Sequence, residues 1–134
     1  GRIQGRGKII CEIEGLTIVN THLSLAPKAQ SEQLKFIAGD LKGRENIVMC
    51  GDLNMRAGAG ALTAFADECG LEIMTHARTK THPAWAPKRD LDHILTSHSL
   101  DAKPARVHDV RMSDHLPAST TLVASDRRIK KPRG

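Results

Sequence analysis

The chain has 134 residues, a net charge of +5 and 40% hydrophobic residues, but only 2% aromatic residues and no tyrosine. This length suits one domain and is too short for two ordinary ones, so we expect a single core built from aliphatic side chains. The scarcity of aromatic residues argues against a stacking surface for single-stranded nucleic acid. No apolar run approaches the about 20 residues of a membrane span, which excludes a transmembrane segment from the sequence given.

The first two predicted elements form a hairpin. Residues 8–14 and 16–22 have the composition of β-strands. Gly15 stands between them and indicates a tight turn, so we expect the two strands to pair with each other.

The next elements are a helix and a buried strand. Apolar residues between positions 34 and 41 recur at helical spacing, and they predict a helix that begins at Gln30 or Ser31 and ends at Gly43. The continuous apolar run 46–50 is typical of a strand buried on both faces.

The remainder of the chain predicts one more helix and three more strands. The helix spans residues 61–69, and a long loop follows it at 75–89. The strands are expected at residues 91–96, 105–112 and 118–124. The fold class is therefore α/β, with a mixed β-sheet of about six strands and helices against one face. Two helices cannot cover both faces of such a sheet, so we expect the other face to need a partner.

The last ten residues carry much of the positive charge. Residues 125–134 contain five basic residues and one acidic residue, which leaves a net charge of +1 for the rest of the chain. This segment is interpreted as a basic, flexible tail, either solvated or in contact with nucleic acid or anionic lipid.

The cysteines argue against a disulfide framework and against a structural zinc site. Their number is three, and no pair has Cys-x-x-Cys spacing. Cys11 and Cys50 lie inside apolar runs, so we expect buried thiols in a reducing compartment. With no signal peptide visible at the start of the chain, this favours a cytoplasmic location.

Polar residues follow or precede several predicted strands, and they are the candidates for chemistry. They occur in the four clusters 20–22, 51–54, 91–93 and 113–115. Each cluster alone is explained by turn formation or by packing of a histidine. Together, at the edge where strand ends meet, three carboxylates would repel one another unless a hard cation relieves them. Oxygen ligands of this kind suit Mg²⁺, Mn²⁺ or Ca²⁺, and histidines beside them suit hydrolysis of a phosphate ester.

These clusters also resemble the motifs of a known family. The runs are Thr-Ile-Val-Asn-Thr-His-Leu at 17–23, Gly-Asp-Leu-Asn at 51–54, Leu-Asp-His-Ile-Leu at 91–95 and Met-Ser-Asp-His-Leu-Pro at 112–117. In order and spacing they are similar to the endonuclease/exonuclease/phosphatase superfamily, which has the deoxyribonuclease I-like α/β/β/α sandwich. The stretch 81–85 also looks like bacterial members. The resemblance implies a divalent-metal-dependent phosphoesterase, acting on nucleic acid, lipid or a small phosphate ester.

The resemblance further implies the catalytic roles of single residues. Asp52 matches the carboxylate that activates the attacking water, and Asn54 matches an amide that holds a phosphate oxygen. His115 matches the imidazole that binds the scissile phosphate, and Asp92 matches the carboxylate that orients it. His22 matches a second histidine, which contacts the phosphate or the leaving group.

Two further residues are candidates for binding the metal ion and the phosphate. Asp114 matches a metal-site carboxylate, and Asp52 is expected to share the metal, which would be Mg²⁺ or Mn²⁺. Arg89 is a candidate for positive charge near the phosphate, although a solvated Lys88–Arg89 pair is the ordinary interpretation.

The chain matches only the second half of this family. The first half normally supplies an asparagine and the glutamate that is the principal metal ligand, and none of the glutamates here has a similar setting. We therefore interpret residues 1–124 as a C-terminal half-domain. Its open sheet face would be covered by the missing N-terminal half or by a second copy, and alone it is expected to be weakly active or inactive. The alternative is a non-catalytic binding or assembly module that uses the open face.

Overall fold

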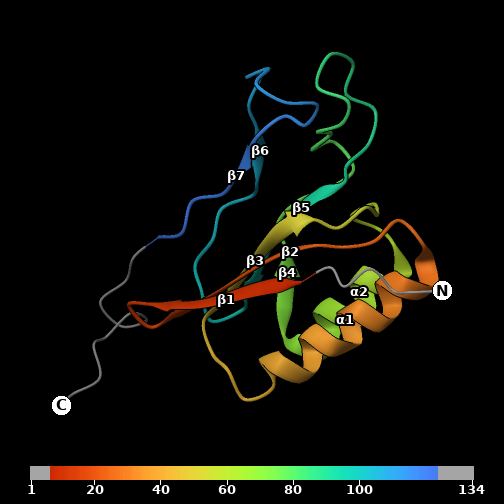
Figure 1. Ribbon diagram of the computed structural model, residues 1–134. Coiled ribbons are helices and arrows are strands. Elements are labelled where there is room, and N and C mark those ends of the chain that lie inside the picture. Colours follow the sequence, from red (N-terminus) through yellow and green to blue (C-terminus); the bar gives the residue numbers. More distant parts are fainter. Residues whose placement is uncertain (1–6, 124–134) are drawn as a thin grey trace.

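The computed structural model describes residues 7–123, and they form a mixed α/β structure (Figure 1). The basic segment predicted at 125–134 lies outside the described residues. In chain order, the elements are β1 (Lys8–Ile13), β2 (Leu16–His22), α1 (Pro27–Leu41), β3 (Ile47–Asp52), α2 (Gly60–Cys69), β4 (Leu71–Ile73), β5 (Asp92–Ser97), β6 (Arg106–Val107) and β7 (Ala118–Ser119).

The main sheet has five strands in the order β1-β2-β3-β5-β4. β2 and β3 run parallel to each other, whereas β1 is antiparallel to β2, and β5 is antiparallel to both β3 and β4. The carboxyl ends of β2 and β3 therefore lie at the same edge as the start of β5. This edge is where the sequence predicts the polar clusters to meet.

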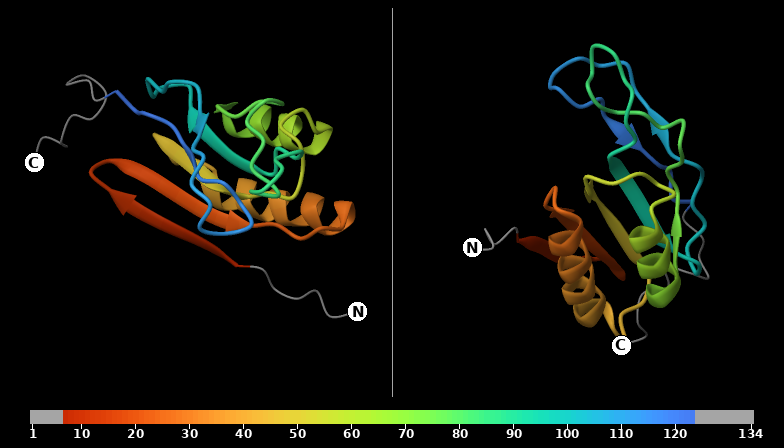
Figure 2. Two further views of the ribbon diagram at one scale, coloured as in Figure 1. Left: turned by 90° about the horizontal axis from the view of Figure 1, so that it is seen from above. Right: turned by 90° about the vertical axis from the view of Figure 1, so that its right-hand side faces the viewer.

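Both helices lie side by side on one face of the sheet, as predicted (Figures 1 and 2). Leu34 and Ile37 of α1 and Leu62 and Phe65 of α2 are buried in one cluster together with Leu95 of β5. Each buried aliphatic side chain of this kind contributes about 2 kcal/mol relative to its exposed form. This aliphatic core holds the sheet edge in place.

The opposite face of the sheet is only partly covered. Near β5, a smaller cluster of Met74, Ile94 and Ala105 packs on it. At β1, Ile9 is 69% exposed and Ile13 is 49% exposed. No helix among residues 7–123 covers this face (Figure 2).

Two burial predictions are wrong because of this open face. The strand predicted at 46–50 is not buried on both sides, since Ile47 and Met49 are buried while Val48 and Cys50 are half-buried. Cys11 is exposed rather than buried, because its strand places it on the face opposite the helices.

The predicted strands 105–112 and 118–124 are much shorter than expected. Only β6 and β7 form, and they pair with each other in a separate two-stranded sheet. They extend beyond the main sheet beside the loop 74–91 (Figure 1). β4, which the sequence analysis did not predict, pairs with β5 at the end of the main sheet.

The helix boundaries differ at one end only. α1 begins at Pro27, earlier than Gln30 or Ser31, because proline suits the first turn of a helix, where its missing N–H is not needed. α2 ends as predicted at Gly70, which has a φ of 66° and donates its N–H to carbonyls of the last turn. Neither helix of the described chain is long and apolar enough to cross a membrane.

Candidate active site

Three polar residues stand in register across three strands of the sheet. His22, the last residue of β2, pairs with Asp52, the last residue of β3, and Asp52 pairs with Asp92, the first residue of β5. The Nε2 atom of His22 lies 3.4 Å from Oδ2 of Asp52. The sheet itself therefore brings these three predicted residues together.

Gly51 makes the close approach of β2 and β3 possible directly before Asp52. Its φ is 153°, and a Cβ atom at this position would lie 1.8 Å from the main-chain oxygen of Thr21. No other residue fits there without moving the backbone, so glycine fixes the position of the neighbouring carboxylate.

His115 completes the cluster from a loop distant in the sequence. Its Nδ1–H donates to Oδ2 of Asp92 at 2.6 Å, and its Nε2 lies 3.6 Å from Oδ2 of Asp52. Thr81 Oγ1 donates to the same Asp92 oxygen. One imidazole thus lies between two carboxylates, and its Nε2 atom faces Asp52.

The surroundings of His115 favour its charged form. Burial lowers the pKa of this imidazole, but the hydrogen bond to Asp92 and the negative charges of Asp92, Asp52 and Asp114 outweigh that effect. The pKa of His115 is therefore raised above the ordinary 6.5. The side chain of His115 is 26% exposed, and a cationic imidazole that solvent can reach can hold an anion such as phosphate.

Asn54 braces the turn that follows β3. It has a φ of 51°, which asparagine tolerates, and its N–H donates to Oδ1 of Asp52 at 3.0 Å. Its side-chain amide donates to the oxygen of Leu23 at 2.7 Å. Asn54 thus ties the ends of β2 and β3 together and orients the Asp52 carboxylate.

Gln30 supports the same region from α1, and the sequence analysis missed its role. This buried amide donates to the main-chain oxygens of Ser24 at 2.8 Å and Asn54 at 3.0 Å. The residue was considered only as a helix start. Its place in the first turn of a helix beside a strand end was the available signal.

Main-chain hydrogen bonds join the loop 79–90 to the loop 112–117. Ala84 N–H donates to the oxygen of Asp114 at 2.8 Å, and Leu116 N–H donates to the oxygen of Thr81, also at 2.8 Å. This pairing places His82 against His115, with ring centroids 4.7 Å apart. Sequence analysis did not select His82, because nothing local indicates that the two loops pair.

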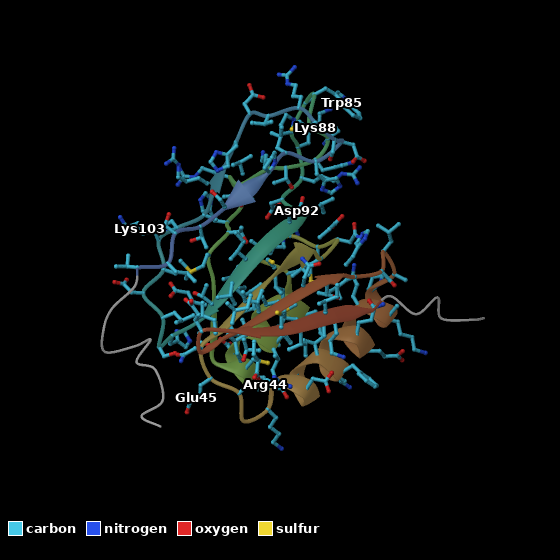
Figure 3. The ribbon with its side chains drawn as sticks, turned by 60° about the vertical axis from the view of Figure 1, so that its left-hand side comes forward. Arg44, Glu45, Trp85, Lys88, Asp92 and Lys103 are labelled. Atoms are coloured by element: carbon cyan, nitrogen blue, oxygen red, sulfur yellow. The ribbon has the colours of Figure 1, made fainter. Side chains whose placement is uncertain are left out.

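Asp114 and Arg89 lie further from the strand edge than the other predicted residues. The carboxylate of Asp114 is 64% exposed and lies 3.8 Å from Nε2 of His82, on the His82 side of His115. Arg89 is exposed, and its main chain pairs with that of His82. Trp85 and Lys88 belong to the same loop, beyond Asp92 (Figure 3).

His93, the histidine next to Asp92, has a structural role. It is 1% exposed, its Nε2–H donates to the oxygen of Met55 at 2.6 Å, and its Nδ1 accepts from Thr75 Oγ1 at 2.6 Å. Strand alternation points it away from the cluster that contains Asp92. The Asp-His pair at 92–93 therefore contributes only its aspartate to the site.

Comparison with protein families assigns this chain to a known family. The family model for the endonuclease/exonuclease/phosphatase family matches residues 7–115. The chain belongs to this family. Its members are hydrolases that act on phosphate esters. A comparison with curated protein sequences finds no significant match.

Solved structures of the endonuclease/exonuclease/phosphatase family share the fold. A mannosyl-6-phosphatase from Bacteroides thetaiotaomicron superposes with a TM-score of 0.68 at 21% identity, covering 81% of this chain and 51% of that one. The 3' phosphatase NExo from Neisseria, bound to a product DNA hairpin, superposes with a TM-score of 0.71 at 16% identity, covering 92% and 66%. Beta toxin from Staphylococcus aureus gives 0.59 at 19% identity, covering 87% and 56%. The chain thus has the family fold and spans about half to two thirds of these structures.

The site contains carboxylate and imidazole atoms that could supply some of the ligands of a divalent cation. Asp52, Asp92 and His115 offer ligand atoms within 4.8 Å of one another, and His82, Asp114 and His115 form a second such group. Asp92 uses Oδ2 for its hydrogen bonds with His115 and Thr81, and Asp52 uses Oδ1 for the Asn54 N–H. A hard cation would take the remaining carboxylate oxygens, and Asp114 is the most exposed of the three carboxylates. Mg²⁺ is commonly held by one or two carboxylates, with water and substrate phosphate completing its shell.

Proposed function

We propose that this chain is the phosphate-binding half of a divalent-metal-dependent phosphoesterase. The observation that carries the proposal is the arrangement Asp92–His115–Asp52, in which one imidazole bridges two carboxylates at the edge of the sheet. This edge is where open α/β sheets bind ligands. Membership of a family of phosphate-ester hydrolases supports the same conclusion.

His115 is proposed to bind the scissile phosphate. Asp92 accepts a hydrogen bond from the Nδ1–H and stabilises the charged ring, which leaves the Nε2–H to donate to a phosphate oxygen. A hydrogen bond between charged partners is about twice as strong as one between neutral partners. Charge that develops on the phosphate during the reaction is therefore stabilised by a group already in place.

Asp52 is proposed to act on the attacking water. Its Oδ1 is held by the Asn54 N–H, so Oδ2 can accept the proton as water oxygen bonds to phosphorus. The bond from phosphorus to the leaving oxygen breaks, and that oxygen takes up a proton. His22, 58% exposed and 3.4 Å from Asp52, lies where it can contact the phosphate or the leaving group.

Mg²⁺ or Mn²⁺ is the proposed cofactor, and Asp52 and Asp114 are its proposed ligands here. When bound, such a cation neutralises phosphate oxygens. Asn54 and Arg89 are proposed to contribute to phosphate binding, Asn54 with the amide that also donates to Leu23. The exposed guanidinium of Arg89 is the more adaptable of the two.

Two substrate classes are considered for the proposed phosphoesterase: nucleic acid, and a lipid or small phosphate ester. One relative is named as a mannosyl-6-phosphatase and another as a 3' phosphatase bound to DNA. Outside residues 125–134 the net charge is only +1, which favours a lipid or small phosphate ester over a long nucleic acid. Binding of a nucleic acid would weaken steeply with salt, whereas binding of a small ester would not.

The proposed activity is weak in this chain alone, because the metal-binding glutamate implied by the family resemblance is not supplied. The test compares Mg²⁺-dependent hydrolysis of bis(p-nitrophenyl) phosphate by this chain and by the complete parent of which we infer it to be half. We expect the parent to turn over at least about a hundredfold faster. Equal rates would contradict the partial-domain proposal, and inactivity of both would contradict the phosphoesterase proposal.

A second candidate function is supported by the open sheet face. Ile9 and Ile13 are exposed on β1, and such an apolar face favours docking of a second copy or of another sheet. A binding or assembly module would therefore sediment as a dimer or larger species. A monomer at every concentration tested would contradict this alternative.

A further inference from the structure

We propose that His82, Asp114 and His115 form a zinc-binding site where the loops 79–90 and 112–117 meet, and that zinc there withdraws His115 from phosphate. The ligand atoms of these three residues all lie within 4.8 Å of one another. Two imidazole nitrogens and one carboxylate oxygen are a donor set that zinc uses in enzymes, with water in the fourth position. Mg²⁺ prefers oxygen ligands, so the two imidazole nitrogens of this donor set favour zinc, whereas Mg²⁺ would use the Asp114 carboxylate together with Asp52.

The backbone holds the two histidines in facing positions. Thr81 and His82 N–H groups both donate to the oxygen of Arg89, and Arg89 N–H donates back to the oxygen of His82. The loop of His115 joins this small hairpin through the hydrogen bond from Ala84 to Asp114. The imidazole rings are consequently 4.7 Å apart without relying on contacts between their own side chains.

The individual ligand atoms have few competing partners. Nε2 of His82 lies 3.8 Å from the Asp114 carboxylate, beyond hydrogen-bond distance, and its buried Nδ1 has no hydrogen-bond partner among the described residues. The Nε2 atom of His115 lies 3.6 Å from Asp52, which is also beyond a hydrogen bond. In His115, Nδ1 is bonded to Asp92 and Nε2 is within reach of no hydrogen-bond acceptor that the structure describes, so Nε2 is the nitrogen that a metal ion would bind.

His115 is oriented as a zinc-binding histidine usually is. Its Nδ1–H donates to the carboxylate of Asp92, which leaves Nε2 as the ligand atom. A carboxylate partner of this kind fixes the ring and raises the basicity of the ligand nitrogen. The Thr81 hydroxyl in turn donates a hydrogen bond to the same carboxylate of Asp92.

Small side-chain rotations would close the site around the ion. Tetrahedral zinc with bonds of about 2.0 Å holds its ligands about 3.3 Å apart, so the atoms need to approach by an ångström or so. Asp114 is 64% exposed and can rotate freely, and the side chains of His82 and His115 are each 26% exposed. Zinc can therefore enter from solvent.

The test is calorimetric titration of the chain with Zn²⁺, and separately with Mg²⁺, with Co²⁺ absorption as a probe of tetrahedral nitrogen ligation. The variants are His82→Gln and Asp114→Asn, and His98→Ala, at an exposed histidine outside the site, is the matched control. Wild type and His98→Ala should bind one Zn²⁺ and give the Co²⁺ spectrum. His82→Gln and Asp114→Asn should each weaken Zn²⁺ binding at least about tenfold.

Equal Zn²⁺ affinity in wild type and both variants would overturn the proposal, as would an absence of Zn²⁺ binding by wild type. If His82→Gln fails to fold, His82→Asn decides the matter, because Asp114 also belongs to the proposed Mg²⁺ site whereas His82 does not. The inhibitory consequence rests on the proposed function. Zn²⁺ should inhibit phosphoester hydrolysis of the parent less in His82→Gln than in wild type. If hydrolysis is absent altogether, the phosphoesterase proposal fails, while the titrations still decide the zinc site.

Discussion

The Nδ1 atom of His115 lies 2.6 Å from Oδ2 of Asp92, although 23 residues separate them in the chain. Asp92 begins β5, whereas His115 belongs to a loop that main-chain hydrogen bonds fasten to the segment before β5. The contact is thus fixed from both sides. It gives the site its charged imidazole, and its removal is the subject of the first prediction.

Replacing Asp92 with Asn should lower the pKa of His115. The variant loses the hydrogen bond and the charge that raise this pKa against the effect of burial. Titration of the imidazole resonances by NMR measures the change. Asp101→Asn, at an exposed residue of another loop, should leave the pKa as in wild type. An unchanged pKa in Asp92→Asn would mean that the contact is absent in solution.

The stability of the fold should depend on the charge of His115 in a defined direction. Because the folded state raises the pKa of His115, the charged ring stabilises the folded form fully below its ordinary pKa of about 6.5. This contribution is lost as the pH rises through the raised value. Urea unfolding of wild type and His115→Gln should show a stability difference that shrinks with rising pH. A difference that grows with pH would contradict the assigned sign.

Gly51→Ala should destabilise the chain by about 3 kcal/mol. The added Cβ would meet the main-chain oxygen of Thr21 at 1.8 Å, at a φ that disfavours side chains. Gly58→Ala is the matched control, because a Cβ there has nothing within 4 Å. Urea unfolding provides the measurement, and similar stabilities for the two variants would show that β2 and β3 do not approach this closely.

Gln30→Ala should cost about 1–3 kcal/mol of folding stability, because the half-buried carbonyls of Ser24 and Asn54, just after β2 and β3, lose their donor. Glu32→Ala, at an exposed position of the same helix, should change stability by less than about 0.5 kcal/mol. Thermal unfolding compares the two. If Gln30→Ala is as stable as its control, the glutamine does not brace the site.

The cysteines should differ in reactivity. Burial, together with the nearby Glu68, raises the pKa of the Cys69 thiol to about 11, whereas Cys11 is exposed on the open sheet face. Reaction with a disulfide reagent near neutral pH should therefore label Cys11 first and Cys69 last. Mass spectrometry of the labelled peptides shows the order in which the cysteines react. Faster labelling of Cys69 would indicate that α2 does not pack as described.

The sequence predicts the site residues at the strand ends and, through the family motifs, also His115 and Asp114 in the loop 112–117. His22, Asp52 and Asp92 occupy strand ends, and the register of a mixed sheet places such ends at one edge. His82 was not predicted, because its position depends on hydrogen bonds between two irregular loops. Loop pairing of this kind leaves no periodic pattern in the sequence.

The same distinction explains the errors in the fold. The helices and the central strands have strong apolar periodicity, and they form where predicted, apart from the earlier start at Pro27. β4 has only three residues, too few to show a period. The strands predicted around β6 and β7 lack a sheet to extend along, because the two segments pair beyond the end of the main sheet.

The central claim is that His115, oriented by Asp92, binds a phosphate group next to Asp52. NMR titration with inorganic phosphate in the presence of Mg²⁺ tests this claim most directly. The imidazole resonances of His115 and His22 should shift saturably, while that of His98 stays in place. His115→Gln should weaken phosphate binding about tenfold or more, the loss expected for one charge-assisted hydrogen bond. Unmoved His115 resonances, or equal affinity in the variant, would contradict the account.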